Sequence, residues 1–318
     1  MKVLIGRNFM NLEGAIPDLE QEFPDVEFVF GGNDSPSMIH DADIYMGWLN
    51  RDVWLKAEKM KWLQSPSSGI NYYLAIPEFV ESDCILTSAR GTHGACLAES
   101  AMAMIFAHTR GIVNFTKRQQ QHKWSNKELR SSLSEMTDCT LGIIGLGMVG
   151  RSLAERARAF GPRIIAVDMF PKNKPDTVDE LWGLDKLNDL MAVSDYVVVT
   201  VPYTPDTHHM IDAEQIAAMK PSAALIGISR GKIIVEEPLV EALQSDKLAF
   251  AALDVFAKEP LPEDSPLWDV ENLLITPHIA GGTQYEGKYV IDIFRENLTK
   301  FLAGERPLRN EINKKQGF

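Results

Sequence analysis

The stretch Leu141-Gly-Ile-Ile-Gly-Leu-Gly-Met-Val-Gly150 decides the fold of this chain. Its apolar start predicts a buried strand. Three glycines, Gly145, Gly147 and Gly150, then follow in the spacing G-x-G-x-x-G. Apolar residues then recur three or four positions apart, which indicates a helix. Gly161 follows them, and glycine is the residue that most often ends a helix. The sequence therefore predicts a strand, a glycine-rich turn and a helix in direct succession.

Each part of this pattern suits a bound dinucleotide. Gly145 permits the tight turn, Gly147 lets the backbone approach a pyrophosphate, and Gly150 allows close helix–strand packing. The helix N-terminus offers N–H groups and partial positive charge to the phosphates. The next strand pattern, 164–167, ends in Asp168, whose carboxylate can bind both ribose hydroxyls and repel a 2′-phosphate. No arginine follows closely, so the sequence predicts NAD rather than NADP.

The glycine motif alone is weak, because such turns also serve packing only. Here the strand, the glycines, the helix, the second strand and the terminal acid occur together and in order, which favours the dinucleotide interpretation.

Composition excludes several classes of protein. The 318 residues suffice for two domains with cores. A net charge of -12 argues against nucleic acid or an anionic membrane as partner. Cys84, Cys96 and Cys139 cannot form a disulfide framework, which fits a reducing compartment. Without a signal-peptide pattern or a membrane-length apolar run, we expect a cytoplasmic protein.

The chain alternates strand and helix patterns, which predicts an α/β fold with parallel sheets. Strand patterns lie at 3–5, 26–30, 42–48, 62–64, 85–87, 196–201, 223–228, 250–255 and 273–275, and helix patterns at 12–23, 53–60, 98–109 and 236–244. The polar segment 117–134 predicts a solvated connection. We expect two Rossmann- or flavodoxin-like domains, each a doubly wound parallel sheet, with the cofactor cleft between them. Their ranges are 1–99 plus 285–318 for the substrate-binding domain and 100–284 for the NAD-binding domain.

Three polar residues follow predicted strands of the second domain, namely Arg230, Glu259 and His278. Parallel strands bring their carboxyl ends to one edge of a sheet, where the nicotinamide would lie. The arginine fork suits a carboxylate with an adjacent oxo group, and an imidazole can give or take a proton near neutral pH. Glu259 would orient His278. Taken singly, these residues are more often a surface arginine, a loop acid and a capping histidine than members of a site.

Other candidate sites are less specific. Residues 65–69, Ser-Pro-Ser-Ser-Gly, follow a strand and could hold a carboxylate with backbone amides, although a simple turn has the same composition. His93 and Cys96 form an H-x-x-C without partners, and no metal-ligand set is predicted.

Together these motifs resemble the D-isomer-specific 2-hydroxyacid dehydrogenase family. The matching stretches are 141–147, 201–207, 229–231, 253–256 with 259–260, and 276–282. The resemblance covers residues 100–284 closely and the first domain more loosely, through Ser68-Gly69 and 91–99. Asn71 departs from the family's frequent Gly-x-Asp loop, and Glu259 argues against formate, because relatives acting on formate carry glutamine there.

The resemblance implies roles for individual residues. Arg230 is expected to hold the substrate carboxylate, and His278 to act as acid/base with Glu259. The residues expected to bind the cofactor are Gly145, Leu146, Gly147, Met148, Val149, Asp168, Pro202, Thr207, Ile228 and Asp254. Ser68 and Gly69 are expected to bind the substrate through amides, and Trp48 to form a pocket wall. Similar proteins are homodimers joined through their NAD-binding domains.

The sequence thus predicts an oxidoreductase that transfers a hydride between NAD(H) and C2 of a small 2-oxo acid or D-2-hydroxy acid. The alternative is an NAD(H)-sensing binding protein or co-repressor on the same fold. Lactate, hydroxyisocaproate, mandelate, glycerate and glycolate all stay open as substrates, as does the direction of the reaction.

Overall fold

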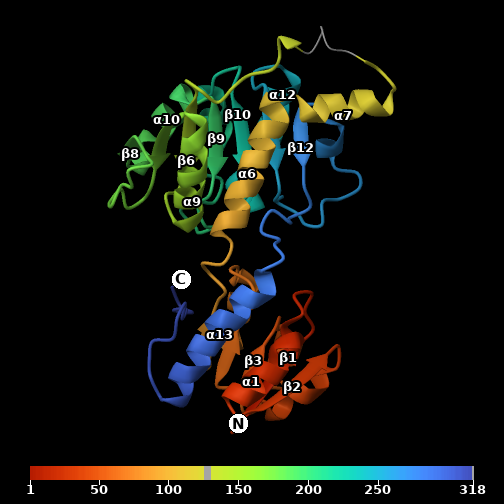
Figure 1. The fold of residues 1–318 in the computed structure, drawn as a ribbon, viewed down its shortest axis with the longest axis vertical. Helices are drawn as coiled ribbons and strands as arrows, with labels where there is room; N and C mark the ends of the chain where they lie inside the picture. The colour runs from red at the N-terminus through yellow and green to blue at the C-terminus, as the bar shows by residue number, and fades with distance from the viewer. Residues whose placement is uncertain (125–129, 317–318) are drawn as a thin grey trace. The chain divides into compact units, whose positions relative to one another are not determined.

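The computed structural model describes residues 1–124 and 130–316, which divide into two compact units. Unit 1 comprises Met1–His93 and Thr283–Phe318, and unit 2 comprises Gly94–Gly282. Each unit is a parallel sheet covered by helices on both faces (Figure 1). The expected α/β fold with two doubly wound sheets is confirmed. The expected domain roles stay predictions.

Within the described residues, the sheet of unit 2 has seven parallel strands in the order β12-β11-β10-β9-β6-β7-β8. They are β6 (Thr140–Ile144), β7 (Arg163–Val167), β8 (Glu180–Trp182), β9 (Tyr196–Val199), β10 (Ala224–Gly227), β11 (Phe250–Leu253) and β12 (Leu273–Ile275). The chain order reverses between β6 and β9. In open α/β sheets ligands bind at such a switch point, outside the carboxyl ends of the strands.

Helices cover both faces of this sheet because each has one apolar side. The helices are α6 (Gly94–Thr109) and α9 (Met148–Ala157) on one face, and α10 (Leu187–Val193), α11 (Ala213–Ala218) and α12 (Glu236–Gln244) on the other. Leu190, Ile216 and Leu239 of the second group share one buried cluster. Helix α7 (Ile112–Gln120) turns away from α6 at Gly111, whose φ is 65° (Figure 1).

Unit 1 has a five-stranded parallel sheet in the order β2-β1-β3-β4-β5 within its described residues. The strands are β1 (Lys2–Gly6), β2 (Glu27–Gly32), β3 (Ile44–Met46), β4 (Trp62–Gln64) and β5 (Ile85–Thr87). One face is covered by α1 (Ile16–Glu22) and α13 (Glu286–Leu302), the other by α2 (Ser35–Met38), α3 (Arg51–Trp54), α4 (Asn71–Leu74) and α5 (Pro77–Val80). Phe294 of α13 stacks on Trp62 with ring centroids 5.2 Å apart.

Two expected elements are wrong. The helix expected at 53–60 ends at Trp54, because the N–H groups of Lys56 and Ala57 close turns on carbonyls three residues back. The solvated connection expected at 117–134 begins inside α7, and its residues 125–129 lie outside the described residues. The short edge strand β8 had no clear alternation to predict it.

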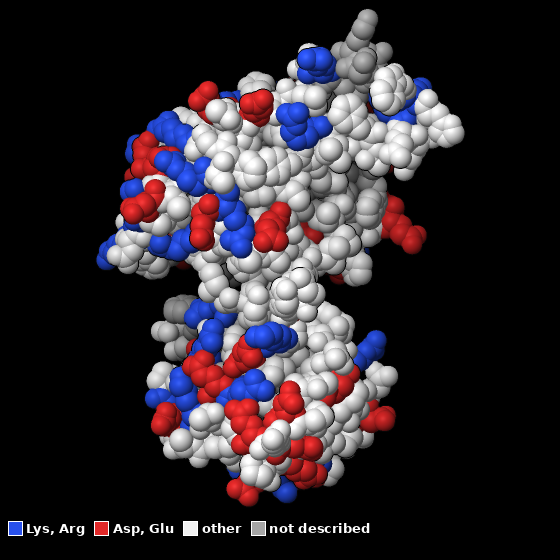
Figure 2. Space-filling view, in the orientation of Figure 1, with Lys and Arg blue, Asp and Glu red and all other residues white. Residues whose placement is uncertain are grey.

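On the face shown in Figure 2, acidic and basic side chains are interspersed on both units rather than gathered in a basic stripe. None of the helices in the described ranges is long and apolar enough to cross a membrane.

Candidate active site

The glycine-rich turn between β6 and α9 has the geometry that a dinucleotide requires. Gly145 has φ 96°, and a Cβ there would lie 2.8 Å from Val201. A Cβ on Gly150 would lie 2.1 Å from the carbonyl oxygen of Gly145, so the helix can approach this closely only with glycine. A Cβ on Gly147 would meet no described atom within 4 Å. The turn therefore leaves room for phosphates beside the N-terminus of α9, which no described side chain caps.

Asp168 follows β7 directly and faces this turn. Its carboxylate accepts hydrogen bonds from the Leu146 N–H at 2.7 Å and the Phe170 N–H at 2.8 Å. These contacts hold the carboxylate beside the glycine-rich turn, where a ribose would meet it. Leu146 is buried, whereas Met148 is 51% exposed, so the first supports the turn and the second is accessible to a ligand.

The three predicted polar residues follow three neighbouring strands, β10, β11 and β12. The Glu259 Oε2 and His278 Nδ1 atoms lie 2.6 Å apart, so Glu259 fixes the ring through one nitrogen and leaves Nε2 for a substrate. The other oxygen of Glu259 accepts from the Phe256 N–H at 2.8 Å. Arg230 is half-buried and donates to the Ser229 carbonyl at 2.7 Å.

Asp254 organises the segment that carries His278. It is 1% exposed, and its carboxylate accepts from the Thr276 hydroxyl at 2.6 Å and from the Ile279 and Ala280 N–H groups at 3.0 Å each. Its carbonyl accepts from the His278 N–H at 2.8 Å. His278 has φ 54° and so needs this support. Asp254 therefore has a structural role that the sequence did not reveal, and its contact with a cofactor stays a prediction.

The other residues that the sequence predicts to bind the cofactor lie near the carboxyl ends of β9 and β10. The Thr207 hydroxyl donates to the Pro202 carbonyl at 2.7 Å and accepts from the Thr204 N–H, so it shapes the turn after β9. Ile228 is 3% exposed and belongs to the core. These residues support the walls of the site through their packing.

In unit 1, the loop after β4 carries Ser68 and Gly69. The Gly69 N–H already donates to the Ser67 hydroxyl at 3.1 Å. The Ser68 hydroxyl contacts His93 Nδ1 at 2.9 Å, and His93 Nε2 lies 3.4 Å from Glu286 Oε1. The sequence alone does not reveal these two contacts of His93, because Ser68 and Glu286 lie far from it in the chain.

Trp48 follows β3 and stacks on Phe9, with ring centroids 5.3 Å apart. The Tyr73 hydroxyl donates to the neighbouring Gly47 carbonyl at 2.7 Å. Burial raises the pKa of Tyr73 well above its ordinary value, so this donor keeps its proton. No group of three or more metal-ligating side chains occurs in the part of the chain that the structure describes.

A doubly wound sheet with a glycine-rich phosphate turn, and a histidine–carboxylate pair at its strand ends, defines the class of dinucleotide-dependent oxidoreductases. Residues 102–280 match the family model described as "D-isomer specific 2-hydroxyacid dehydrogenase, NAD binding domain". The chain belongs to the D-isomer-specific 2-hydroxyacid dehydrogenase family.

Individual relatives agree with this assignment. The chain is 35% identical to the D-3-phosphoglycerate dehydrogenase of Methanocaldococcus jannaschii over 92% of its own length and 56% of that protein's, so it spans little more than half of this relative. A family member from Aeromonas salmonicida subsp. salmonicida has a solved structure with TM-score 0.88 and 29% identity, over 98% of this chain and 99% of that one. The NADPH-dependent glyoxylate/hydroxypyruvate reductase of Sinorhizobium meliloti, solved with NADP and sulfate, has TM-score 0.84 and 25% identity over the whole of both chains.

Proposed function

We propose that the protein is an NAD-dependent D-2-hydroxyacid dehydrogenase, which reversibly reduces a small 2-oxo acid at C2. The observation that carries this proposal is the 2.6 Å contact between Glu259 and His278. These two residues and Arg230 follow three neighbouring strands of one sheet. A general acid and a carboxylate-binding fork on neighbouring strand ends are what such a reduction requires.

The glycine-rich turn and Asp168 would hold a nicotinamide dinucleotide, which would supply the hydride for this reaction. Arg230 holds the substrate carboxylate and the adjacent carbonyl oxygen. Protonated His278 gives its Nε2 proton to that oxygen in the reduction, and the neutral ring takes the proton back in the oxidation. Glu259 stabilises the protonated ring and fixes its orientation. Within unit 1, we propose that the amides of Ser68 and Gly69 bind a substrate carboxylate, for which the Gly69 N–H must leave Ser67.

We propose NAD as the cofactor because Asp168 is held in place by two backbone N–H groups. A 2′-phosphate would meet this fixed negative charge, whereas a ribose diol can donate to it. The relative from Sinorhizobium meliloti is named NADPH-dependent, so the family as a whole does not decide the choice.

The test follows NADH absorbance with pyruvate, phenylpyruvate, 2-oxoisocaproate, hydroxypyruvate and glyoxylate, each repeated with NADPH. We expect one of these acids to oxidise NADH. The rate of this oxidation should fall by about tenfold to hundredfold or more in Arg230→Ala. Faster turnover with NADPH would contradict the role given to Asp168. Tight NADH binding without turnover on any 2-oxo acid would favour a sensor protein instead.

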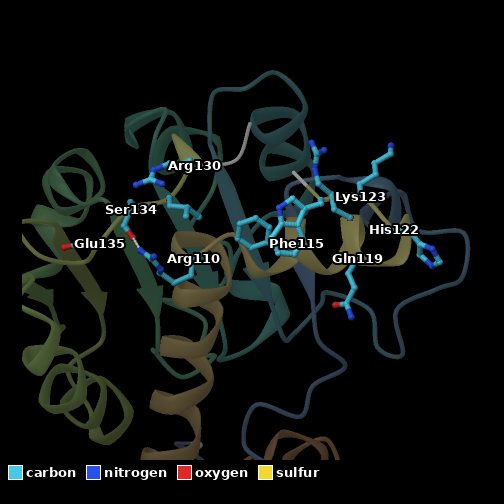
Figure 3. Close-up of a pocket in the computed structure, with 11 residues that line it drawn as sticks. Arg110, Phe115, Gln119, His122, Lys123, Arg130, Ser134 and Glu135 are labelled. Atoms are coloured by element: carbon cyan, nitrogen blue, oxygen red, sulfur yellow. Dashed lines mark hydrogen bonds between the residues drawn. The ribbon is translucent and has the colours of Figure 1, made fainter. Parts of the chain in front are cut away.

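We also propose that the protein is a homodimer joined through unit 2. Helix α7 exposes Ile112 and Phe115, and Trp124 just after it is 93% exposed. Phe115 and Trp124 line a cavity of about 880 Å³, together with Arg110 and Leu133. Figure 3 shows Phe115, Gln119 and Lys123 around this cavity, with Arg110 hydrogen-bonded to the Ser134 carbonyl. An apolar surface of this kind beside a projecting helix suits a second subunit.

A further inference from the structure

A second cavity, of about 610 Å³, opens in unit 1 at the carboxyl ends of its first three strands. Its lining includes Arg7 after β1, Asn33 after β2 and Trp48 after β3. In the sheet order β2-β1-β3-β4-β5, the order in which the chain adds parallel strands reverses between β1 and β3. The cavity therefore lies at the switch point of this sheet, where α/β sheets bind ligands.

Arg7 is the cation that distinguishes this cavity. Its side chain is exposed, and no acceptor or carboxylate among the described residues lies within hydrogen-bond or ion-pair distance of its guanidinium. Arg51, which also lines the cavity, is already paired with Glu78. A guanidinium offers a fork of donors that suits a carboxylate or a phosphate. Arg7 is thus available to an anion that enters the cavity.

The lining of the cavity includes a residue of the helix that follows the loop proposed to hold the substrate carboxylate. Helix α4 begins at Asn71, two residues after Gly69, and its Tyr72 lines the cavity. Strands β1 and β4 are separated only by β3, so their ends are about 10 Å apart, two interstrand spacings. A short acid held at Ser68–Gly69 can therefore extend past Trp48 toward the long side chain of Arg7.

We propose that this cavity takes the far end of the substrate and that Arg7 binds a second anionic group there. The preferred substrates are then 2-oxo acids with a distal carboxylate or phosphate. Trp48, held against Phe9, covers the apolar middle of such a molecule. This inference rests on the proposed function, because it assumes that a 2-oxo acid is bound at Ser68–Gly69.

The test compares substrates in matched pairs, 2-oxoglutarate with 2-oxopentanoate and 3-phosphohydroxypyruvate with hydroxypyruvate. The ratio of kcat/KM values within each pair measures preference for the distal anion. We expect the anionic member to be favoured, and Arg7→Gln to lower the ratio by about tenfold to hundredfold, the effect of losing a charged hydrogen bond. The pair with the larger ratio tells whether the site selects a carboxylate or a phosphate.

Lys56→Gln is the matched control, because it removes the same charge from an exposed residue of unit 1 outside the cavity lining. Preference for the neutral members, or an equal loss of preference in Lys56→Gln, would overturn the role of Arg7 while leaving the proposed function intact. If no 2-oxo acid is turned over, the proposed function fails. Calorimetric titration with 2-oxoglutarate then decides the inference, since binding that Arg7→Gln does not weaken would contradict it.

Discussion

At the scale of single residues, the proposed acid/base pair of Glu259 and His278 is supported by a buried neighbour, Asp254. The Asp254 carboxylate accepts hydrogen bonds from the Thr276 hydroxyl and the N–H groups of Ile279 and Ala280, and these contacts support the segment around His278. Pre-organisation of this kind fixes a proton donor before the substrate arrives. The contact with Glu259 then sets the direction in which the ring faces.

Glu259→Gln should lower kcat by about tenfold to hundredfold, with little change in the melting temperature. The amide keeps the size of the side chain but has no charge to stabilise a protonated imidazole, so proton transfer slows while folding is retained. Steady-state NADH oxidation measures the loss. Glu263→Gln, an exposed acid in the same loop, should retain activity. An active Glu259→Gln enzyme would mean that His278 works without this partner.

Burial makes Cys84 a probe of the folded state. Burial raises the pKa of the Cys84 thiol to about 12, so only about one thiol in ten thousand is ionised at pH 8. Since the thiolate is the reactive form, iodoacetamide should leave Cys84 unmodified in the native protein and label it in urea, as peptide mass spectrometry can measure. Equal labelling rates in both conditions would show that the region around β5 opens readily.

At the scale of elements, the turn between β6 and α9 offers a pair of substitutions with different consequences. Gly150→Ala should lower the free energy of unfolding by about 1–3 kcal/mol, because its Cβ would overlap the Gly145 carbonyl. Gly147→Ala should leave stability almost unchanged but weaken NADH binding, because its Cβ would enter the space left for phosphates. Thermal melts and NADH fluorescence separate the two effects. A stable Gly150→Ala variant would contradict the packing argument.

The sequence predicts elements well where a periodic pattern and burial agree. Helix α12 follows directly from the spacing of its apolar residues, and the parallel strands follow from short apolar runs. It fails where a local hydrogen bond overrides the pattern, as after Trp54, or where an edge strand is half-exposed, as at β8. Contacts between distant segments, such as Ser68 with His93 and Glu286, leave no local signal in a single sequence.

The candidate site shows the same limit. The positions of Arg230, Glu259 and His278 at neighbouring strand ends follow from the alternation of elements, because parallel strands end at one edge. The supporting role of Asp254 does not, because it depends on backbone N–H groups that only the folded loop brings together. Arg7 likewise becomes a candidate anion-binding residue only when the structure shows the cavity that it lines.

At the scale of the whole molecule, the exposed side chains of α7 make the proposed dimer testable. Phe115→Glu would place a charge in an interface that buries this ring, so the variant should sediment as a monomer in analytical ultracentrifugation. Leu302→Glu changes a comparably exposed apolar residue of unit 1 and should leave the assembly unchanged. A native protein that sediments as a monomer would contradict the proposal, as would a Phe115→Glu variant that stays dimeric.

The order of segments in unit 1 has a consequence for synthesis of the chain on the ribosome. Unit 1 is interrupted after His93 by all of unit 2, and its core includes Val290, Phe294 and Leu298 of α13. Trp62 therefore cannot stack on Phe294 until some two hundred further residues have been translated. Unit 2 is contiguous and can complete its own core first. The nascent N-terminal segment must stay unaggregated through that delay, so chaperone demand should concentrate on unit 1.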